Sequence, residues 1–85
     1  MPTVKLFATL RKLAGVKEVS ITGSAVGLVM NELVKQHPNL DGVLLENGNL
    51  RPHVLVTLNG HTTNDLNLQV AEQDVIAIFP PIAGG

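Results

Sequence analysis

The sequence ends in two glycines, and the carboxylate of Gly85 is the group with the clearest potential for chemistry. Glycine lacks a side chain, so a Gly-Gly terminus can enter a narrow channel and adopt backbone angles closed to other residues. If the tail has a function, we therefore expect it to be chemistry at this carboxylate, presented to another protein. The pair alone is weak support, because with 8 Gly in 85 residues it would end about 1 in 100 random chains of this kind of composition.

Other residue types that carry catalysis or bind metals are scattered along the chain. His37, His53 and His61 fall on unrelated segments, and there is no cysteine to complete a metal site or act as a nucleophile. Glu72 and Asp74 are close in sequence, but a catalytic carboxylate pair needs an enclosing pocket that so short a chain can hardly provide. We therefore expect turn and surface roles for these residues, and a chain that is not catalytic alone.

The composition argues against several classes of partner. Hydrophobic residues make up 45% of the sequence, as in a folded domain. The formal net charge is −1 and the only aromatic residues are Phe7 and Phe79, so we expect no nucleic-acid partner. No apolar run approaches the roughly 20 residues of a membrane span, and the N-terminus lacks a signal-peptide pattern. We expect a cytoplasmic domain with no membrane partner.

Hydrophobic periodicity predicts the elements that position the terminus. Alternating apolar residues predict strands over residues 3–10 and 16–21. Short apolar runs predict two more, over 54–58 and over 74–79, and the last is apolar on both faces as a central strand should be. Helical spacing and a stop at Pro38 predict one helix, over residues 24–37. The connecting segments are expected to contain a loop or single helical turn over 11–15 closed by Gly15, a helical turn over 43–46, Asn-Gly turns at 47–48 and 59–60, and a short return strand within 61–70.

This order predicts an α+β fold in which one helix covers one face of a mixed sheet. The helix-facing side is expected to contain Val4, Leu6, Ile76 and Ile78. By strand alternation the uncovered side receives Phe7, Val75, Ala77 and Phe79. Such a set is either a partner surface or a group of singly exposed apolar residues, and the pattern alone leaves both open.

The last strand and the tail together closely resemble a known C-terminal signature. They read Asp74-Val75-Ile76-Ala77-Ile78-Phe79-Pro80-Pro81-Ile82-Ala83-Gly84-Gly85. This sequence resembles the MoaD/ThiS family of sulfur carriers, and in particular the MoaD-type small subunits of molybdopterin synthase. Residues 6–15, 25–29 and 58–60 are similar to the family's opening strand and loop, helix start and hairpin. A helix-capping threonine is common in the family where Ala25 stands here, so we expect Ser24 to cap the helix.

The resemblance implies a ubiquitin-like β-grasp domain over residues 1–79 and an extended tail over residues 80–85. It implies that an E1-like partner uses ATP to adenylate Gly85, which then becomes a thiocarboxylate, with no cofactor bound to this chain. The large subunit of molybdopterin synthase would receive the tail, formed by Pro80, Pro81, Ile82, Ala83, Gly84 and Gly85. Phe7, Val75, Ala77 and Phe79, with Arg11 near their edge, would dock the domain.

The two prolines suit this role, because proline lacks an N–H and ends a strand. Six residues starting at Pro80 reach at most roughly 20 Å, which is enough to enter a partner's active site. Three alternatives remain open: a ThiS-type carrier for thiazole synthesis, a ubiquitin-like modifier joined to lysines, and an interaction domain whose tail is incidental.

Overall fold

A five-stranded mixed sheet crosses the molecule in the order β2-β1-β7-β5-β6. The structure, a computed structural model, describes residues 1–80. Its strands are β1 (Thr3–Leu6), β2 (Glu18–Ser20), β5 (Leu55–Leu58), β6 (His61–Thr63) and β7 (Val75–Phe79). β7 runs parallel to β1 on one side and antiparallel to β5 on the other, so the last strand is central, as its apolar residues on both faces predict.

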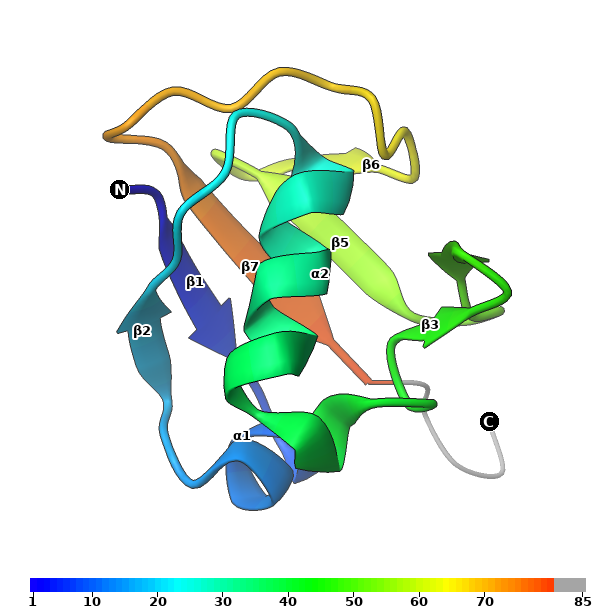
Figure 1. The fold of residues 1–85 in the computed structure, drawn as a ribbon. Helices are drawn as coiled ribbons and strands as arrows, with labels where there is room; N and C mark the ends of the chain where they lie inside the picture. The colour runs from blue at the N-terminus through cyan, green and yellow to red at the C-terminus, as the bar shows by residue number, and fades with distance from the viewer. Residues whose placement is uncertain (81–85) are drawn as a thin grey trace.

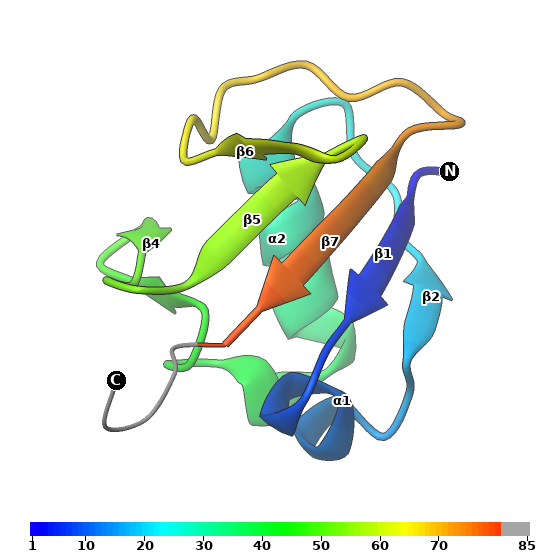
Figure 2. The same cartoon turned by 180° about the vertical axis from the view of Figure 1, so that it is seen from behind.

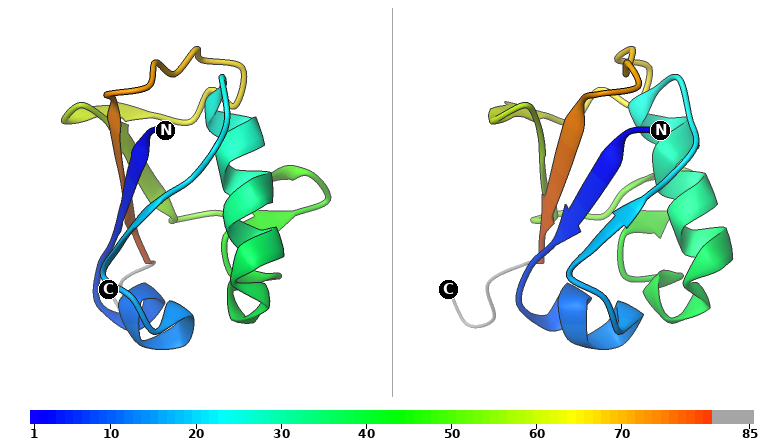
Figure 3. Two further views of the ribbon diagram at one scale, coloured as in Figure 1. Left: turned by 60° about the vertical axis from the view of Figure 1, so that its left-hand side comes forward. Right: turned by 90° about the vertical axis from the view of Figure 1, so that its left-hand side faces the viewer.

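One face of the sheet is covered by the main helix, α2 (Val26–Gln36), and Figure 3 shows the two layers edge-on. The predicted inward residues pair across the strands, Val4 with Ile76 and Leu6 with Ile78, and each is at most 1% exposed. The buried core consists of Val4, Leu6, Leu10, Ile21, Val26, Val29, Met30, Leu33, Leu40, Leu44, Val56, Val70, Ile76 and Ile78. The layered α+β arrangement predicted from the sequence is therefore confirmed.

The first strand is shorter than predicted, because the chain reverses at Ala8. Leu10 N–H donates to the carbonyl oxygen of Phe7 (3.1 Å), and Ala8 has φ 52° and ψ −125°, the angles of the first central position in a type II′ turn. The reversal ends β1 at Leu6 and starts a short helix, α1 (Thr9–Ala14). Gly15 closes α1 in the left-handed conformation with φ 79°, as predicted.

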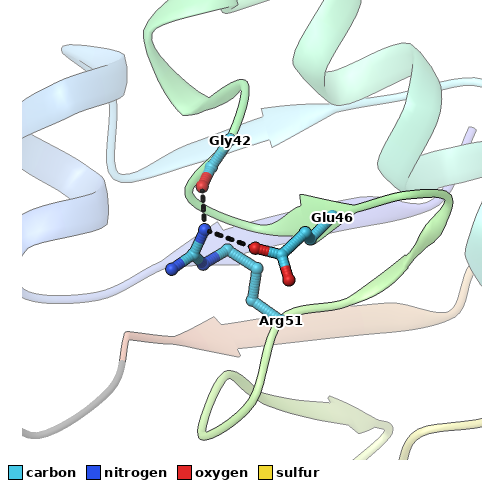
Figure 4. A network of polar contacts seen from close by, with 3 residues as sticks. All are labelled: Gly42, Glu46 and Arg51. Atoms are coloured by element: carbon cyan, nitrogen blue, oxygen red, sulfur yellow. Dashed lines mark hydrogen bonds and ion pairs between the residues drawn. The ribbon is translucent and has the colours of Figure 1, made fainter.

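The predicted helical turn over residues 43–46 is wrong, because residues 45–50 form a small hairpin. After a 3-10 turn, η1 (Pro38–Leu40), strand β3 (Leu45–Glu46) pairs with β4 (Asn49–Leu50). Arg51 braces the hairpin through its Nη1 atom, which donates to Gly42 O (2.9 Å) and pairs with Glu46 Oε2 (3.3 Å), as Figure 4 shows. Both charged side chains are largely exposed, so the ion pair itself adds little stability.

The start of α2 is held by a distant loop and not by Ser24, so the predicted side-chain cap is wrong. Ala25 is the capping residue and makes no side-chain hydrogen bond. Instead, Val26 N–H donates to Leu68 O (2.9 Å) and Gly27 N–H donates to Leu66 O (2.8 Å). Two backbone carbonyls thus satisfy amides that a helix start leaves unpaired.

Gly27 permits this close approach of the loop to the helix. A Cβ atom at position 27 would lie 3.0 Å from Leu66 O and 3.2 Å from Leu66 Cβ. Both distances are shorter than ordinary van der Waals contact, so the loop would have to move. Gly27 has low helix propensity, but its lack of a side chain allows the loop at Leu66 to pack against the start of α2.

Asn59 and Asp74 tie the start of β7 to the turn between β5 and β6. The Asp74 carboxylate accepts hydrogen bonds from Ala71 N–H (2.8 Å) and from Asn59 Nδ2 (3.0 Å). Asn59 Oδ1 accepts from Val75 N–H (2.9 Å), and Asn59 N–H donates to Val75 O (2.8 Å). The hydrogen bond from Ala71, followed by that from Asn59, holds the pKa of Asp74 below its ordinary value of 3.8. Asp74 thus lies directly before β7, one residue outside the strand predicted over 74–79.

Candidate functional site

The root of the predicted tail is the end of β7, where Phe79 is followed by the half-buried Pro80. The remaining tail positions lie outside the described residues, so the roles expected for them stay predictions: Pro81, Ile82, Ala83, Gly84 and Gly85. The division into a domain over 1–79 and a tail over 80–85 likewise stays a prediction. The site can therefore be built from the residues that hold and surround the root.

Hydrogen-bonded strands fix the root on both sides. At the end of β7, Ile78 pairs with Leu6 of β1 and with Val56 of β5, and Phe79 pairs with Leu55 of β5. Ile78 is fully buried beneath α2. The chain therefore leaves the domain from a fixed point at the end of its central strand.

The sheet face turned away from α2 carries the two aromatic residues, and Figure 2 shows this face of the ribbon with no helix in front of the sheet. The rings of Phe7 and Phe79 are stacked, with centroids 4.5 Å apart and an interplanar angle of 13°. Both residues are half-buried. The reversal at Ala8, directly after Phe7, keeps Phe7 beside the root while the chain turns into α1.

The structure brings the other predicted interface residues to the same region. Val75 and Ala77 alternate with buried residues of β7, so they share the open face with Phe79. Arg11 is exposed on α1, which begins where β1 ends beside β7. Val75 and Ala77 thus lie on one face with Phe79, and the roles expected for these residues and for Arg11 in binding a partner stay predictions.

Two residues of this face were not among the interface residues expected from the sequence. Leu55 is 43% exposed and pairs with Phe79, so it extends the apolar surface to β5. Lys5 is exposed and pairs with both Ala77 and Glu18, which places a positive charge within the face. Alternation within each strand is visible in the sequence, but the register between β5 and β7 that joins Leu55 to Phe79 is not. We refer to Phe7, Leu55, Val75, Ala77 and Phe79, with Lys5 on the same face and Arg11 on the adjoining helix α1, as the open-face surface.

The domain also has a groove of about 430 Å³ at the opposite end, near the start of β1 and β7. Glu72 is its one ionisable side chain among the described residues, so a catalytic acid–base pair is not formed there. Within residues 1–80, no group of three or more histidine or acidic residues is placed to hold a metal ion. In the same part of the chain, none of the helices is both long and apolar enough to cross a membrane.

Comparison with known proteins gives a family match that spans almost the whole chain. The model of the ThiS family matches residues 4–85, which include the tail. Two curated proteins are similar over nearly the same length. Small archaeal modifier protein 1 of Haloferax volcanii is 39% identical over 85 residues, covering 95% of this chain and 97% of its own. The molybdopterin synthase sulfur carrier subunit of Arabidopsis thaliana is 36% identical over 85 residues, covering 96% of this chain and 80% of its own.

Solved structures give the same result for the fold. The crystal structure of the BexX/CysO complex of Amycolatopsis orientalis contains a chain that superposes on this one with a TM-score of 0.88 at 25% sequence identity. The superposition covers 100% of both chains. The α+β architecture is thus that of the ubiquitin-like β-grasp fold, as the sequence predicts.

Proposed function

The chain belongs to the ThiS family of ubiquitin-like sulfur carriers, and from this premise we propose that it carries sulfur as a thiocarboxylate on Gly85. The main support is the family match to residue 85, which joins a Gly-Gly tail to a β-grasp domain. Strand pairing with β1 and β5 holds the end of β7, where the predicted tail begins, in a fixed position relative to the domain that a partner would bind.

The proposed activation makes Gly85 an acyl donor. A carboxylate oxygen of Gly85 attacks the α-phosphate of ATP on an E1-like partner, and pyrophosphate leaves. Hydrosulfide then attacks the carbonyl carbon of the acyl adenylate, a C–S bond forms, and AMP leaves. The product is a thiocarboxylate. The chain supplies the acyl group and the surface that docks, while the partner supplies the catalytic groups.

The open-face surface is the proposed docking site for the activating enzyme. An aromatic pair packed on a rigid sheet offers apolar area at low entropic cost, and aromatic residues are enriched among those that dominate binding energy. Lys5 lies opposite the exposed Glu18, which offsets its charge, and the positive charge of Arg11 on α1 would steer this region towards an acidic partner surface. Docking here places the start of the tail at the edge of the interface.

We further propose the large subunit of molybdopterin synthase as the recipient of the sulfur. This pathway is supported by the similarity to the Arabidopsis protein, whose name states that role. A second candidate function is that of a protein modifier joined through Gly85 to lysines, and the 39% identity to an archaeal modifier protein favours it. Both functions begin with the same acyl adenylate.

The absence of cysteine from the sequence gives a direct test of the carrier function. The chain is incubated with an activating enzyme of the family, ATP and sulfide, and then treated with a fluorescent iodoacetamide. A thiocarboxylate is alkylated rapidly, and this chain offers no thiol as background. We expect labelling that requires ATP and is absent from a variant lacking Gly84 and Gly85. No ATP-dependent labelling, with a known carrier labelled in parallel, would contradict the proposal.

A sample of the activated chain can then be split into two portions to test the two functions separately. One portion is mixed with the large synthase subunit and the pterin precursor, and the other with lysine-containing proteins and a conjugating extract. Sulfur appearing in the pterin supports the synthase role. Isopeptide-linked Gly85 without sulfur transfer would replace that role with the modifier function.

A further inference from the structure

The chain contains two Asn-Gly pairs, and the structure places them in closely matched turns. Asn47-Gly48 joins β3 to β4, and Asn59-Gly60 joins β5 to β6. The φ angles are 54° and 80° in the first turn and 51° and 86° in the second. All four residues are exposed. Backbone conformation and access to water are therefore similar at the two sites.

The two asparagine side chains differ in their hydrogen bonds. At Asn59, the Nδ2 atom donates to Asp74 Oδ1 (3.0 Å) and the Oδ1 atom accepts from Val75 N–H (2.9 Å). At Asn47, the side chain makes no hydrogen bond to any other residue within 1–80, and the backbone carbonyl is reached only by Asn49 Nδ2 at 3.5 Å. One amide is held on both sides and the other is free to rotate.

The strands around Asn47 are also held by fewer pairings than those around Asn59. β3 and β4 contribute two residues each to a separate two-stranded sheet, whereas β5 belongs to the five-stranded sheet and pairs with β7 over four residues. Leu45 and Leu50 pack against the core, but a pair of two-residue strands has fewer ladder hydrogen bonds than a strand inside a larger sheet, so its turn opens more easily. The backbone around Asn47 can therefore reach geometries that the backbone around Asn59 reaches rarely.

We propose that Asn47 is a site of spontaneous deamidation, and that the hydrogen bonds of Asn59 protect the second Asn-Gly pair from the same reaction. The backbone nitrogen of Gly48 attacks Cγ of Asn47, a new N–C bond forms, and the side-chain nitrogen leaves as ammonia with the proton from Gly48. Water then adds to either carbonyl of the resulting succinimide. The products are aspartate and isoaspartate at position 47.

The reaction needs no enzyme, oxidant or cofactor, because the attacking nitrogen, the leaving amide and water are all at the site. Glycine after asparagine favours it, since no side chain obstructs the approach of the nitrogen to Cγ. Conversion adds one negative charge, which takes the formal net charge from −1 to −2. An acidic form of the chain should therefore accumulate with age.

Protection of Asn59 from deamidation preserves the hydrogen bonds at the start of β7. Deamidation there would put a carboxylate in place of the amide that donates to Asp74 at 3.0 Å. Two negative groups would then face each other at the start of β7, the strand that holds the root of the tail. At Asn47 the nearest ion pair is that of Glu46 and Arg51, both exposed, and the sheet that carries the tail is not involved.

The experiment is timed incubation of the full chain at physiological temperature and mildly alkaline pH, followed by peptide mapping. The readout is the mass gain on conversion of amide to acid, localised by fragmentation. Mass is preferred to isoaspartate alone, because Asp41-Gly42 can also form isoaspartate but without a change in mass. We expect Asn47 to convert at least about tenfold faster than Asn59, since two side-chain hydrogen bonds must open at Asn59.

Two variants complete the test. Asn47→Gln should abolish the early acidic form, because the longer side chain cyclises far more slowly. Asp74→Ala should accelerate conversion of Asn59 and leave the rate at Asn47 unchanged, with circular dichroism to confirm folding. Equal rates at the two asparagines in the unmodified chain, or no conversion at Asn47, would overturn the proposal whether or not the Asp74 variant folds.

Discussion

Phe79 links the folded domain to the tail through its backbone and its side chain. Its backbone pairs with Leu55 in the central part of the sheet, and its ring stacks on Phe7 at 4.5 Å. A stacked aromatic pair contributes about 0.5–1.5 kcal/mol beyond the area it buries. The same ring belongs to the surface that we propose meets the activating enzyme, so stability and recognition share one residue.

We predict that Phe79→Asp weakens binding to the activating enzyme by at least about tenfold, because the charge must be desolvated in an apolar interface. Binding is measured by isothermal titration calorimetry, and the fold is checked by thermal unfolding. Leu28→Asp is the matched control, since Leu28 is an apolar residue 54% exposed on α2, in the other layer of the domain. Equal weakening by both variants would place the interface elsewhere.

At the scale of elements, the ends of strands and helices depend on contacts that are distant in sequence. The start of α2 is held by the carbonyls of Leu66 and Leu68, and the start of β7 by Asn59. These contacts connect the helix layer, the loop after β6 and the central strand. These contacts therefore fix the position of β7, the strand from which the predicted tail begins, relative to the helix layer.

Gly27→Ala tests the contact at the start of α2. Helix propensity alone predicts a gain of up to about 1 kcal/mol in the free energy of unfolding. We expect instead a loss of about 1 kcal/mol, because the new Cβ would lie 3.0 Å from Leu66 O and overpacking costs more than propensity returns. Urea unfolding measures the change, with the exposed α2 residue Asn31 changed to alanine as the control. A stabilised Gly27 variant would mean that the loop yields freely.

The pH dependence of stability tests the hydrogen bonds of Asp74. Its pKa is lower in the folded state than the unfolded value of about 4, so ionisation of Asp74 favours folding above that value. This contribution disappears as the pH falls through the lowered pKa. We expect Asp74→Ala to be less stable than the parent near neutral pH, with a difference that shrinks below about pH 4. A difference that is constant down to pH 2 would contradict this account.

The layers and the central position of the last strand could be predicted from the sequence, because Val4, Leu6, Ile76 and Ile78 alternate with outward residues and leave one buried face. The residues at which individual strands and helices begin and end could not be predicted. Ala8 adopts positive φ without the glycine that usually marks such a turn, and strands β3 and β4 are too short for periodicity to detect. Leu55 lies on the open-face surface because of the register between β5 and β7, which the sequence does not show. The amides at the start of α2 are paired by the carbonyls of Leu66 and Leu68, some 40 residues away, and not by the Ser24 side chain.

At the scale of the whole molecule, the domain presents one open sheet face and one fixed exit for the tail. The exit follows the central strand, and α1 and the stacked phenylalanines lie at the same end. The groove, which is lined in part by Leu28 near the start of α2, lies at the opposite end. This polarity fits a protein that is held by its sheet while chemistry takes place beyond its last strand.

The most direct test of the central claim is intact-mass analysis with fragmentation after reaction with the activating enzyme, ATP and a sulfur donor. We predict a mass gain equal to the exchange of one oxygen for one sulfur, located on Gly85 and absent from the variant lacking Gly84 and Gly85. An unchanged mass while a known carrier is converted in parallel, or the added sulfur located at any residue other than Gly85, would contradict the account.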